Sequence, residues 1–89
     1  MSLKHAILVL LEQEPGSGYD LVQRFNQGIG QFWNASHQQV YQQLKKLHDN
    51  KLVDFQTQRQ SDKPDKKIYR ISANGKTELR DWMSESNNP

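Results

Sequence analysis

The sequence is poor in the residues that support several classes of chemistry. It contains no cysteine, which excludes disulfide bonds and thiolate metal sites. No stretch approaches the ~20 consecutive apolar residues that a membrane-spanning helix needs. The apolar run at 3–11 is interrupted by Lys4 and His5, is followed at once by Glu12 and Glu14, and has no small-residue cleavage site. It therefore predicts a helix of a soluble core, and we expect neither a signal peptide nor contact with a membrane.

The sequence also offers little for catalysis. His5, His37 and His48 are isolated and lack the spacing of metal ligands. No G-x-S-x-G nucleophile elbow and no glycine-rich phosphate loop occurs, and the glycines at 16 and 18 are typical of a turn. We therefore expect no enzyme, no metal site and no cofactor.

The positive charge is small but unevenly distributed. The chain has 89 residues, which suit one small domain, and a net charge of only +2. Residues 1–36 carry two Lys/Arg against three Asp/Glu, residues 37–67 carry seven against four, and residues 68–89 carry three against three. The basic excess at 37–67 indicates a surface for nucleic acid, although an ordinary solvated surface explains it equally well.

Hydrophobic periodicity predicts a succession of helices followed by a β-hairpin. Three helices are expected first, then a strand, a polar loop containing Pro64, a second strand and a last helix. Their predicted ranges are 3–13, 17 to about 28, 36–49, 53–58, 59–66, 67–71 and 72–85. The order is that of a winged helix-turn-helix domain over residues 1–84, mainly α with a small β-hairpin wing, followed by a linker or frayed end at 85–89.

The third predicted helix has two different faces. Val40, Leu44 and Leu47 recur at i, i+4 and i+7 and form an apolar stripe. Gln38, Gln42 and Lys45 lie about half a turn away, and long amides and ammonium groups suit base edges and phosphates. A solvated helix surface is the alternative from this pattern alone. The helix is expected to begin with an S-x-x-Q capping box and to end in a left-handed turn near residue 50.

Aromatic and apolar side chains outside this helix have structural and functional explanations. Tyr19 and Phe25 are expected in the core, as are the aromatic residues at 32 and 33, which alternatively line an effector pocket. Trp82 and Met83 either pack inward or meet a second subunit. The lysines of the hairpin loop either bind DNA as a wing or are only solvent-exposed residues of a soluble hairpin tip.

Together these residues resemble the N-terminal domain of the PadR family of bacterial transcriptional regulators. The resemblance spans nearly the whole chain, and its most specific part is the F-W-x-x-S-x-x-Q-V-Y run. It rests on Ala6-Ile7-Leu8, Leu11, Gly18-Tyr19-Asp20-Leu21, Phe32-Trp33-Asn34-Ala35-Ser36, Gln39-Val40-Tyr41, Leu44-Lys45-Lys46-Leu47, Leu52-Val53, Pro64 to Lys67, Tyr69-Arg70-Ile71-Ser72, Gly75, Leu79 and Trp82.

The resemblance implies a cytoplasmic bacterial regulator of transcription, expected to be a repressor. Its partners would be a pseudo-palindromic double-stranded operator, a second copy of itself and a small aromatic effector. Most family members continue into a C-terminal dimerisation domain, which is expected to be absent here, so that the sequence would be either an excised DNA-binding domain or a short member of the family. Family members often have Pro where Gln42 stands and Gly where Lys51 stands, so the local geometry of helix and turn is expected to differ slightly at these two positions.

The resemblance places helix 36–49 in the major groove and the 59–67 wing on the DNA backbone. The helix is expected to approach phosphate with its N-terminal N–H groups. The expected DNA-binding residues are Ser36, His37, Gln38, Gln39, Tyr41, Gln42, Lys45, Lys46, Lys63, Lys66 and Lys67, and the expected dimer face is Trp82 with Met83. The alternatives are a winged-helix protein–protein interaction module and a domain that binds double-stranded or structured RNA.

Overall fold

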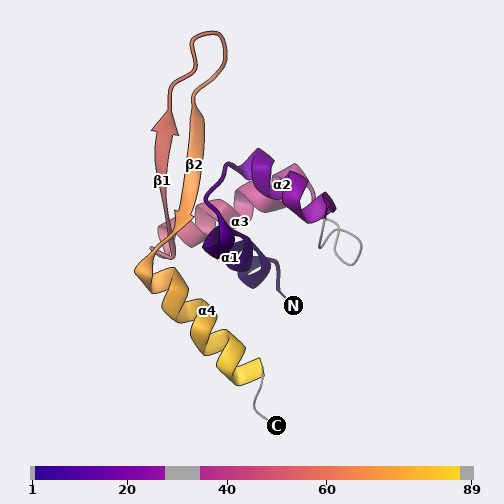
Figure 1. Cartoon of the computed structure of the whole chain (residues 1–89), viewed down its shortest axis with the longest axis vertical. Helices are drawn as coiled ribbons and strands as arrows, with labels where there is room; N and C mark the ends of the chain where they lie inside the picture. Colours follow the sequence, from indigo (N-terminus) through magenta and orange to yellow (C-terminus); the bar gives the residue numbers. More distant parts are fainter. Residues whose placement is uncertain (1, 28–34, 87–89) are drawn as a thin grey trace.

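The structure is a helical cluster from which a hairpin and a helix project in opposite directions (Figure 1). It is a computed structural model that describes residues 2–27 and 35–86. The elements are α1 Leu3–Gln13, α2 Gly18–Gln27, α3 His37–Asp49, β1 Val53–Gln58, β2 Lys66–Ile71 and α4 Ala73–Ser86. The predicted order and the winged helix-turn-helix fold are confirmed.

The core is formed by the apolar faces of the first three helices. The predicted stripe of α3 is fully buried, and it meets Ile7 of α1 with Leu21 and Phe25 of α2. Val53, Tyr69 and Leu79 extend this core under the hairpin and α4. Because most α3 side chains on the opposite side are exposed, the core holds this helix while leaving its polar face in solvent.

Two helices begin with reciprocal capping boxes, as the sequence predicts. Ser17 and Asp20 exchange two hydrogen bonds of 3.0 Å, and Ser36 and Gln39 exchange bonds of 3.0 and 3.1 Å. The N–H of Ser17 lowers the pKa of the Asp20 carboxyl. The stabilisation that this hydrogen bond gives to the fold is therefore present above the ordinary pKa of an Asp carboxyl. It is lost as the pH falls through the lowered pKa of Asp20.

The C-terminal end of α3 is a Schellman turn. The N–H of Lys51 donates to the His48 carbonyl at 3.0 Å, and the N–H of Leu52 donates to the Leu47 carbonyl at 2.9 Å. The left-handed residue is Lys51, with φ of 62°, whereas Asn50 has φ of −91°. The sequence placed the left-handed position near Asn50, one residue too early, because Asn is the better left-handed residue by propensity but lies inside the last hydrogen-bonded turn.

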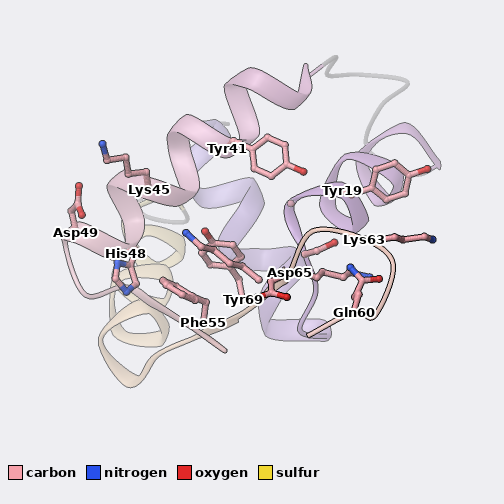
Figure 2. Close-up of a pocket in the computed structure, with 14 residues that line it drawn as sticks. Tyr19, Tyr41, Lys45, His48, Asp49, Phe55, Gln60, Lys63, Asp65 and Tyr69 are labelled. Carbon is pink, nitrogen blue, oxygen red and sulfur yellow. The ribbon is translucent and has the colours of Figure 1, made fainter. Parts of the chain in front are cut away.

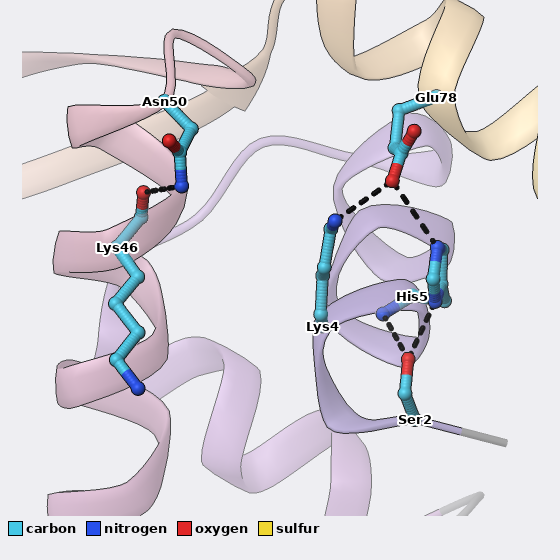
Figure 3. Close-up of polar contacts among 6 residues, drawn as sticks. All are labelled: Ser2, Lys4, His5, Lys46, Asn50 and Glu78. Carbon is cyan, nitrogen blue, oxygen red and sulfur yellow. Dashed lines mark hydrogen bonds and ion pairs between the residues drawn. The ribbon is translucent and has the colours of Figure 1, made fainter.

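We expect Lys51→Gly to stabilise the fold by about 0.5–1 kcal/mol, because glycine adopts positive φ without a Cβ clash. The measurement is the midpoint of urea unfolding. Asn50→Gly is the matched control and should destabilise instead. That substitution removes the 3.0 Å bond from Asn50 Nδ2 to the Lys46 carbonyl, which is drawn in Figure 3, at a position whose φ is negative. Equal effects of the two substitutions would contradict this description of the turn.

The hairpin is joined to the helices through a backbone bridge. The strands are antiparallel, with Val53 opposite Ile71 and Phe55 opposite Tyr69. The turn between α1 and α2 adds a third, single-residue pairing, since Gly16 and Tyr69 exchange backbone bonds of 3.0 and 2.8 Å. The second strand starts at residue 66, one residue earlier than predicted, because that residue still pairs with the end of β1. The wing loop is therefore 59–65.

The start of α4 is fixed against the turn that precedes the hairpin. Ser72 accepts the Gly75 N–H at 3.0 Å and donates its hydroxyl to the Lys51 carbonyl at 2.8 Å, which confirms the predicted cap. Leu79 is buried farther along the helix. The helix runs to residue 86, one residue beyond the predicted end at 85, since neither Glu nor Ser interrupts a last turn.

A polar cluster joins α4 to α1 (Figure 3). Lys4 Nζ donates to Glu78 Oε1 at 2.7 Å and lowers the pKa of that carboxyl. The His5 ring stacks on Trp82 at 4.4 Å, with an interplanar angle of 9°. Burial lowers the pKa of His5 and so disfavours the charged form of the ring in its 3.6 Å contact with Glu78.

One predicted core residue lies on the surface. Phe25 is buried as predicted, but the Tyr19 side chain is 56% exposed. At 100° per residue, Tyr19 lies about 200° from Leu21 and therefore on the opposite side of α2. The predicted aromatic contacts of Phe32 and Trp33 lie outside the described residues.

Candidate nucleic-acid interface

The outer face of α3 presents most of the residues that the sequence assigned to DNA. Val40, Leu44 and Leu47 face the core, so the chain between them turns its amides and lysines outward. The exposed members are Ser36, His37, Gln38, Gln39, Tyr41, Gln42, Lys45 and Lys46. The helix is regular through Gln42, so the family's common proline at this position is not needed for its geometry.

Two of these residues, Ser36 and Gln39, form the cap at the start of α3. Ser36 Oγ accepts the Gln39 N–H, and Gln39 Oε1 accepts the Ser36 N–H. The Val40 N–H is bonded to the Ser36 carbonyl at 3.0 Å. The N–H groups of His37 and Gln38 are therefore the first-turn donors that remain for an anion, and the Gln39 side chain serves first to orient the start of the helix.

The hairpin brings its lysines to the same side of the molecule as α3. Lys63 and Lys67 are exposed, and Lys66 is half-buried. Lys67 Nζ lies 4.7 Å from the centre of the Phe55 ring, which favours one position for this charge. Gln60 Nε2 donates to the Pro64 carbonyl at 3.0 Å and so closes the tip of the wing.

A groove of about 980 Å³ separates α3 from the hairpin (Figure 2). Tyr41 and Lys45 line it from α3, while Lys63, Lys66 and Lys67 line it from the hairpin. The structure thus brings together two parts of the predicted site that are about 20 residues apart in the sequence. The remaining predicted residues lie outside the lining of this groove, on α3 or at its N-cap: Ser36, His37, Gln38, Gln39, Gln42 and Lys46.

The charge and chemistry of the groove suit an anion with an apolar part. Four lysines and two aspartates, Asp49 and Asp65, line it, so its net charge is positive. Its other lining residues include the rings of Phe55 and Tyr69, whose centres are 5.4 Å apart. His48 adds a third ring, 4.8 Å from Phe55. A sugar–phosphate chain combines these two properties.

Two side chains of this surface, Tyr19 and Tyr69, were not predicted from the sequence. Tyr19 lies 5.8 Å from the His37 ring, which in turn lies 6.2 Å from Tyr41. These three exposed rings form one aromatic patch at the N-terminal end of α3. A helical projection of α2 would have placed Tyr19 outside, whereas no local signal identifies Tyr69 as a groove residue, because the tertiary fold brings it there.

Close packing of α2 on α3 positions the Tyr41 ring. A Cβ added to Gly18 would lie 2.2 Å from Tyr41 Cε1, so only glycine fits here without moving that ring. Gly18 is also buried and lines the groove. The glycine therefore leaves the space that this aromatic side chain of the α3 face occupies.

The predicted dimer face remains a prediction. Trp82 is half-buried and stacks on His5, whereas Met83 is 48% exposed. Within residues 2–27 and 35–86, no group of three His, Cys, Asp or Glu residues is placed to hold a metal ion. In the same ranges no helix combines the length and apolar character required to cross a membrane.

Comparison with known proteins agrees with this geometry. The sequence profile of the transcriptional regulator PadR-like family matches residues 7–81. A probable transcriptional regulator of Mycobacterium tuberculosis is 46% identical over 89 residues, covering 100% of this chain and 47% of that protein. The negative transcriptional regulator PadR of Bacillus subtilis is 47% identical over 81 residues, covering 91% of this chain and 44% of that protein. The chain thus spans about half the length of these relatives.

Solved structures of B. subtilis PadR have the same fold. The crystal structure of PadR in complex with operator DNA superposes with a TM-score of 0.85 at 47% identity, covering 91% of this chain and 46% of that chain. PadR in complex with p-coumaric acid gives 0.75 at 43% identity, covering 91% of this chain and 41% of that chain.

Proposed function

Because the chain belongs to the PadR-like family of transcriptional regulators, we propose that it binds double-stranded DNA and regulates transcription. In this proposal α3 enters the major groove and the hairpin lies on the flanking backbone. The matched B. subtilis protein, crystallised with operator DNA, supports this arrangement by its similarity over 91% of this chain. Residues 1–84 are the proposed DNA-binding domain.

The observation that carries the proposal is the continuity of the α3 face with the groove. Gln38 and Gln42 present exposed amides that suit base edges, and Lys45 lies at the boundary between these amides and the groove. The proposed DNA-binding residues are those predicted from the sequence, with Ser36 and Gln39 acting mainly through the helix cap and Lys63, Lys66 and Lys67 acting from the hairpin.

The alternative of a protein–protein interaction module fits this surface less well. Winged helices that bind proteins would present an acidic or apolar α3 face. Here the face is rich in amides and lysines, and its one flanking carboxylate, Asp49, comes only in the last turn. This composition favours a polyanion as the partner.

We further propose a repressor that acts as a two-fold dimer on a pseudo-palindromic operator in the bacterial cytoplasm. One winged-helix module buries only roughly 600–1,000 Å² against DNA, so tight binding requires two of them. The B. subtilis relative is a negative regulator and has been crystallised with p-coumaric acid, which supports repression and a small aromatic effector. Met83 of α4, with Trp82, is the proposed dimer contact within this chain.

The direct test is fluorescence anisotropy with random duplex DNA over a range of salt concentrations. Contacts with about 3–6 phosphates should make log K fall linearly with log salt, with a slope of about −3 to −5. Gln42→Ala should keep this slope, because the amide is neutral, but should broaden the set of sequences selected from a randomised duplex pool. Gln56→Ala, an exposed amide on β1, is the control and should change neither.

Absence of duplex binding at low salt would contradict the proposed function. Binding to a protein partner that is insensitive to salt would favour the interaction module instead. RNA of the same sequence that competed as well as the duplex would point to structured RNA as the partner.

A further inference from the structure

Tyr69 is held rigidly at the base of the groove. The residue is only 8% exposed, and its backbone is paired both with Phe55 on β1 and with Gly16 in the turn between α1 and α2. Its ring contacts the Phe55 ring, at 5.4 Å between centres. Both backbone and ring are therefore fixed, which leaves the hydroxyl in one place.

The Tyr69 hydroxyl opens into the groove without a protein partner. Among the described residues, the hydroxyl has no hydrogen-bond partner. Every side-chain polar atom there that is sealed from solvent does have a partner, so this hydroxyl is accessible to solvent. Since Tyr69 lines the groove, its hydroxyl must reach the open space between α3 and the hairpin. The ring of Tyr69 is thus buried while its hydroxyl is accessible from the groove, so the hydroxyl can donate to a polar acceptor of a ligand there.

The surroundings of this hydroxyl favour an anionic acceptor. Burial, with Tyr41 nearby, raises the pKa of Tyr69, so the phenol remains a donor at neutral pH. Lys45 lies on the α3 side of the groove, and Lys66 and Lys67 lie on the hairpin side (Figure 2 labels Lys45, Tyr41 and Tyr69). A neutral donor between cations is suited to a phosphate oxygen.

We propose that the Tyr69 hydroxyl donates a hydrogen bond to a phosphate of the DNA strand that lies in the groove between α3 and the hairpin. This inference rests on the proposed function and adds to it a buried, uncharged contact from β2. The occupant is a DNA backbone because α3 and the wing loop, which flank the groove, are the two elements proposed to straddle one strand. The lysines at the rim of the groove attract the DNA strand, and the Tyr69 hydroxyl fixes how far the strand enters the groove.

The experiment compares wild type and Tyr69→Phe by anisotropy with the same duplex. The variant keeps the ring and its contact with Phe55 and removes the hydroxyl alone. We expect about 10-fold weaker binding, as for the loss of a hydrogen bond to a charged group, with an unchanged salt slope because no charge is lost. Thr77→Val removes a hydroxyl on α4, outside the groove, and should bind as the wild type does.

A second measurement applies to the unsubstituted chain, whatever the stability of the variant. The protein has three tyrosines, so their ring Cζ signals can be resolved by ¹³C NMR after selective labelling. Addition of the duplex should shift the Tyr69 signal. Inorganic phosphate at millimolar concentration should not shift it to the same extent, because a free anion lacks the rest of the strand.

The outcomes separate this inference from the proposed function. Wild-type binding with equal binding by Tyr69→Phe, or an unmoved Tyr69 signal, would overturn the Tyr69 contact and leave DNA binding intact. A wild type that fails to bind duplex would overturn both. A Tyr69 signal that responds fully to inorganic phosphate would show a site for small anions and overturn the assignment to a DNA strand.

Discussion

Replacing Gly75 with alanine should destabilise the fold by about 2–3 kcal/mol, the largest stability effect that we expect from a single methyl group. A Cβ at this position would lie 2.1 Å from the Leu52 carbonyl oxygen and 2.7 Å from Ile71 Cγ1. The first of these atoms belongs to the backbone and cannot rotate away. That carbonyl also accepts the Ser72 N–H at 3.1 Å, so moving it would disturb the start of α4.

Differential scanning calorimetry measures this effect directly. For a domain of this size, the expected loss corresponds to a melting temperature lower by about 10–20 °C. Elsewhere in a helix, Gly→Ala stabilises by roughly 0.5–1 kcal/mol, so the sign of the change is itself informative. Asn74→Ala, at an exposed neighbouring position, is the control and should not destabilise. A Gly75→Ala protein as stable as the wild type would contradict the close approach of α4 to Leu52.

Lys45→Glu should weaken DNA binding by about 100-fold, or about 3 kcal/mol, without unfolding the domain. Lys45 is exposed on α3 and lines the groove, so it lies where the proposed base-reading face meets the proposed backbone track. Glutamate has similar helix propensity, but its charge would repel a phosphate that lysine attracts. The salt slope should also fall, by roughly 1–2 units, because fewer counterions are released.

Anisotropy titrations at several salt concentrations measure both quantities. Lys76→Glu on α4 makes the same change of net charge at an exposed site outside the groove, and it should weaken binding only slightly. Similar losses for the two substitutions would mean that overall charge, rather than α3, determines binding. That result would contradict the assignment of Lys45.

Features determined by local chemistry could be predicted from the sequence. The apolar stripe of α3 follows from its period, and the capping boxes at Ser17 and Ser36 follow from side chains three residues apart. The hairpin follows from the change to a period of two. The exposed face of α3 could also be identified from the residue pattern, because it is simply the side of the helix opposite the stripe.

Features determined by tertiary contacts could not be predicted. The left-handed turn falls on Lys51 because Leu52 must return to the core beside Leu47, and that requirement overrides the preference of lysine. The groove exists because the Gly16–Tyr69 bridge holds the hairpin beside the helices. The sequence pattern predicts Tyr69 only as an inward-facing strand residue. The position of the hairpin beside the helices places its hydroxyl in the groove.

We propose that α3 and the hairpin together form the surface that meets DNA. Mapping by ¹⁵N–¹H NMR, with random duplex added at low salt, locates this surface residue by residue. We predict that the shifted amide signals fall on residue 36 and the following part of α3 to residue 48, and on 59–69 of the hairpin, whereas residues 76–81 of α4, which precede the proposed dimer contact, stay unchanged. Shifts centred on α4 and α1, or no shifts at all, would contradict a DNA-binding surface formed by α3 and the hairpin.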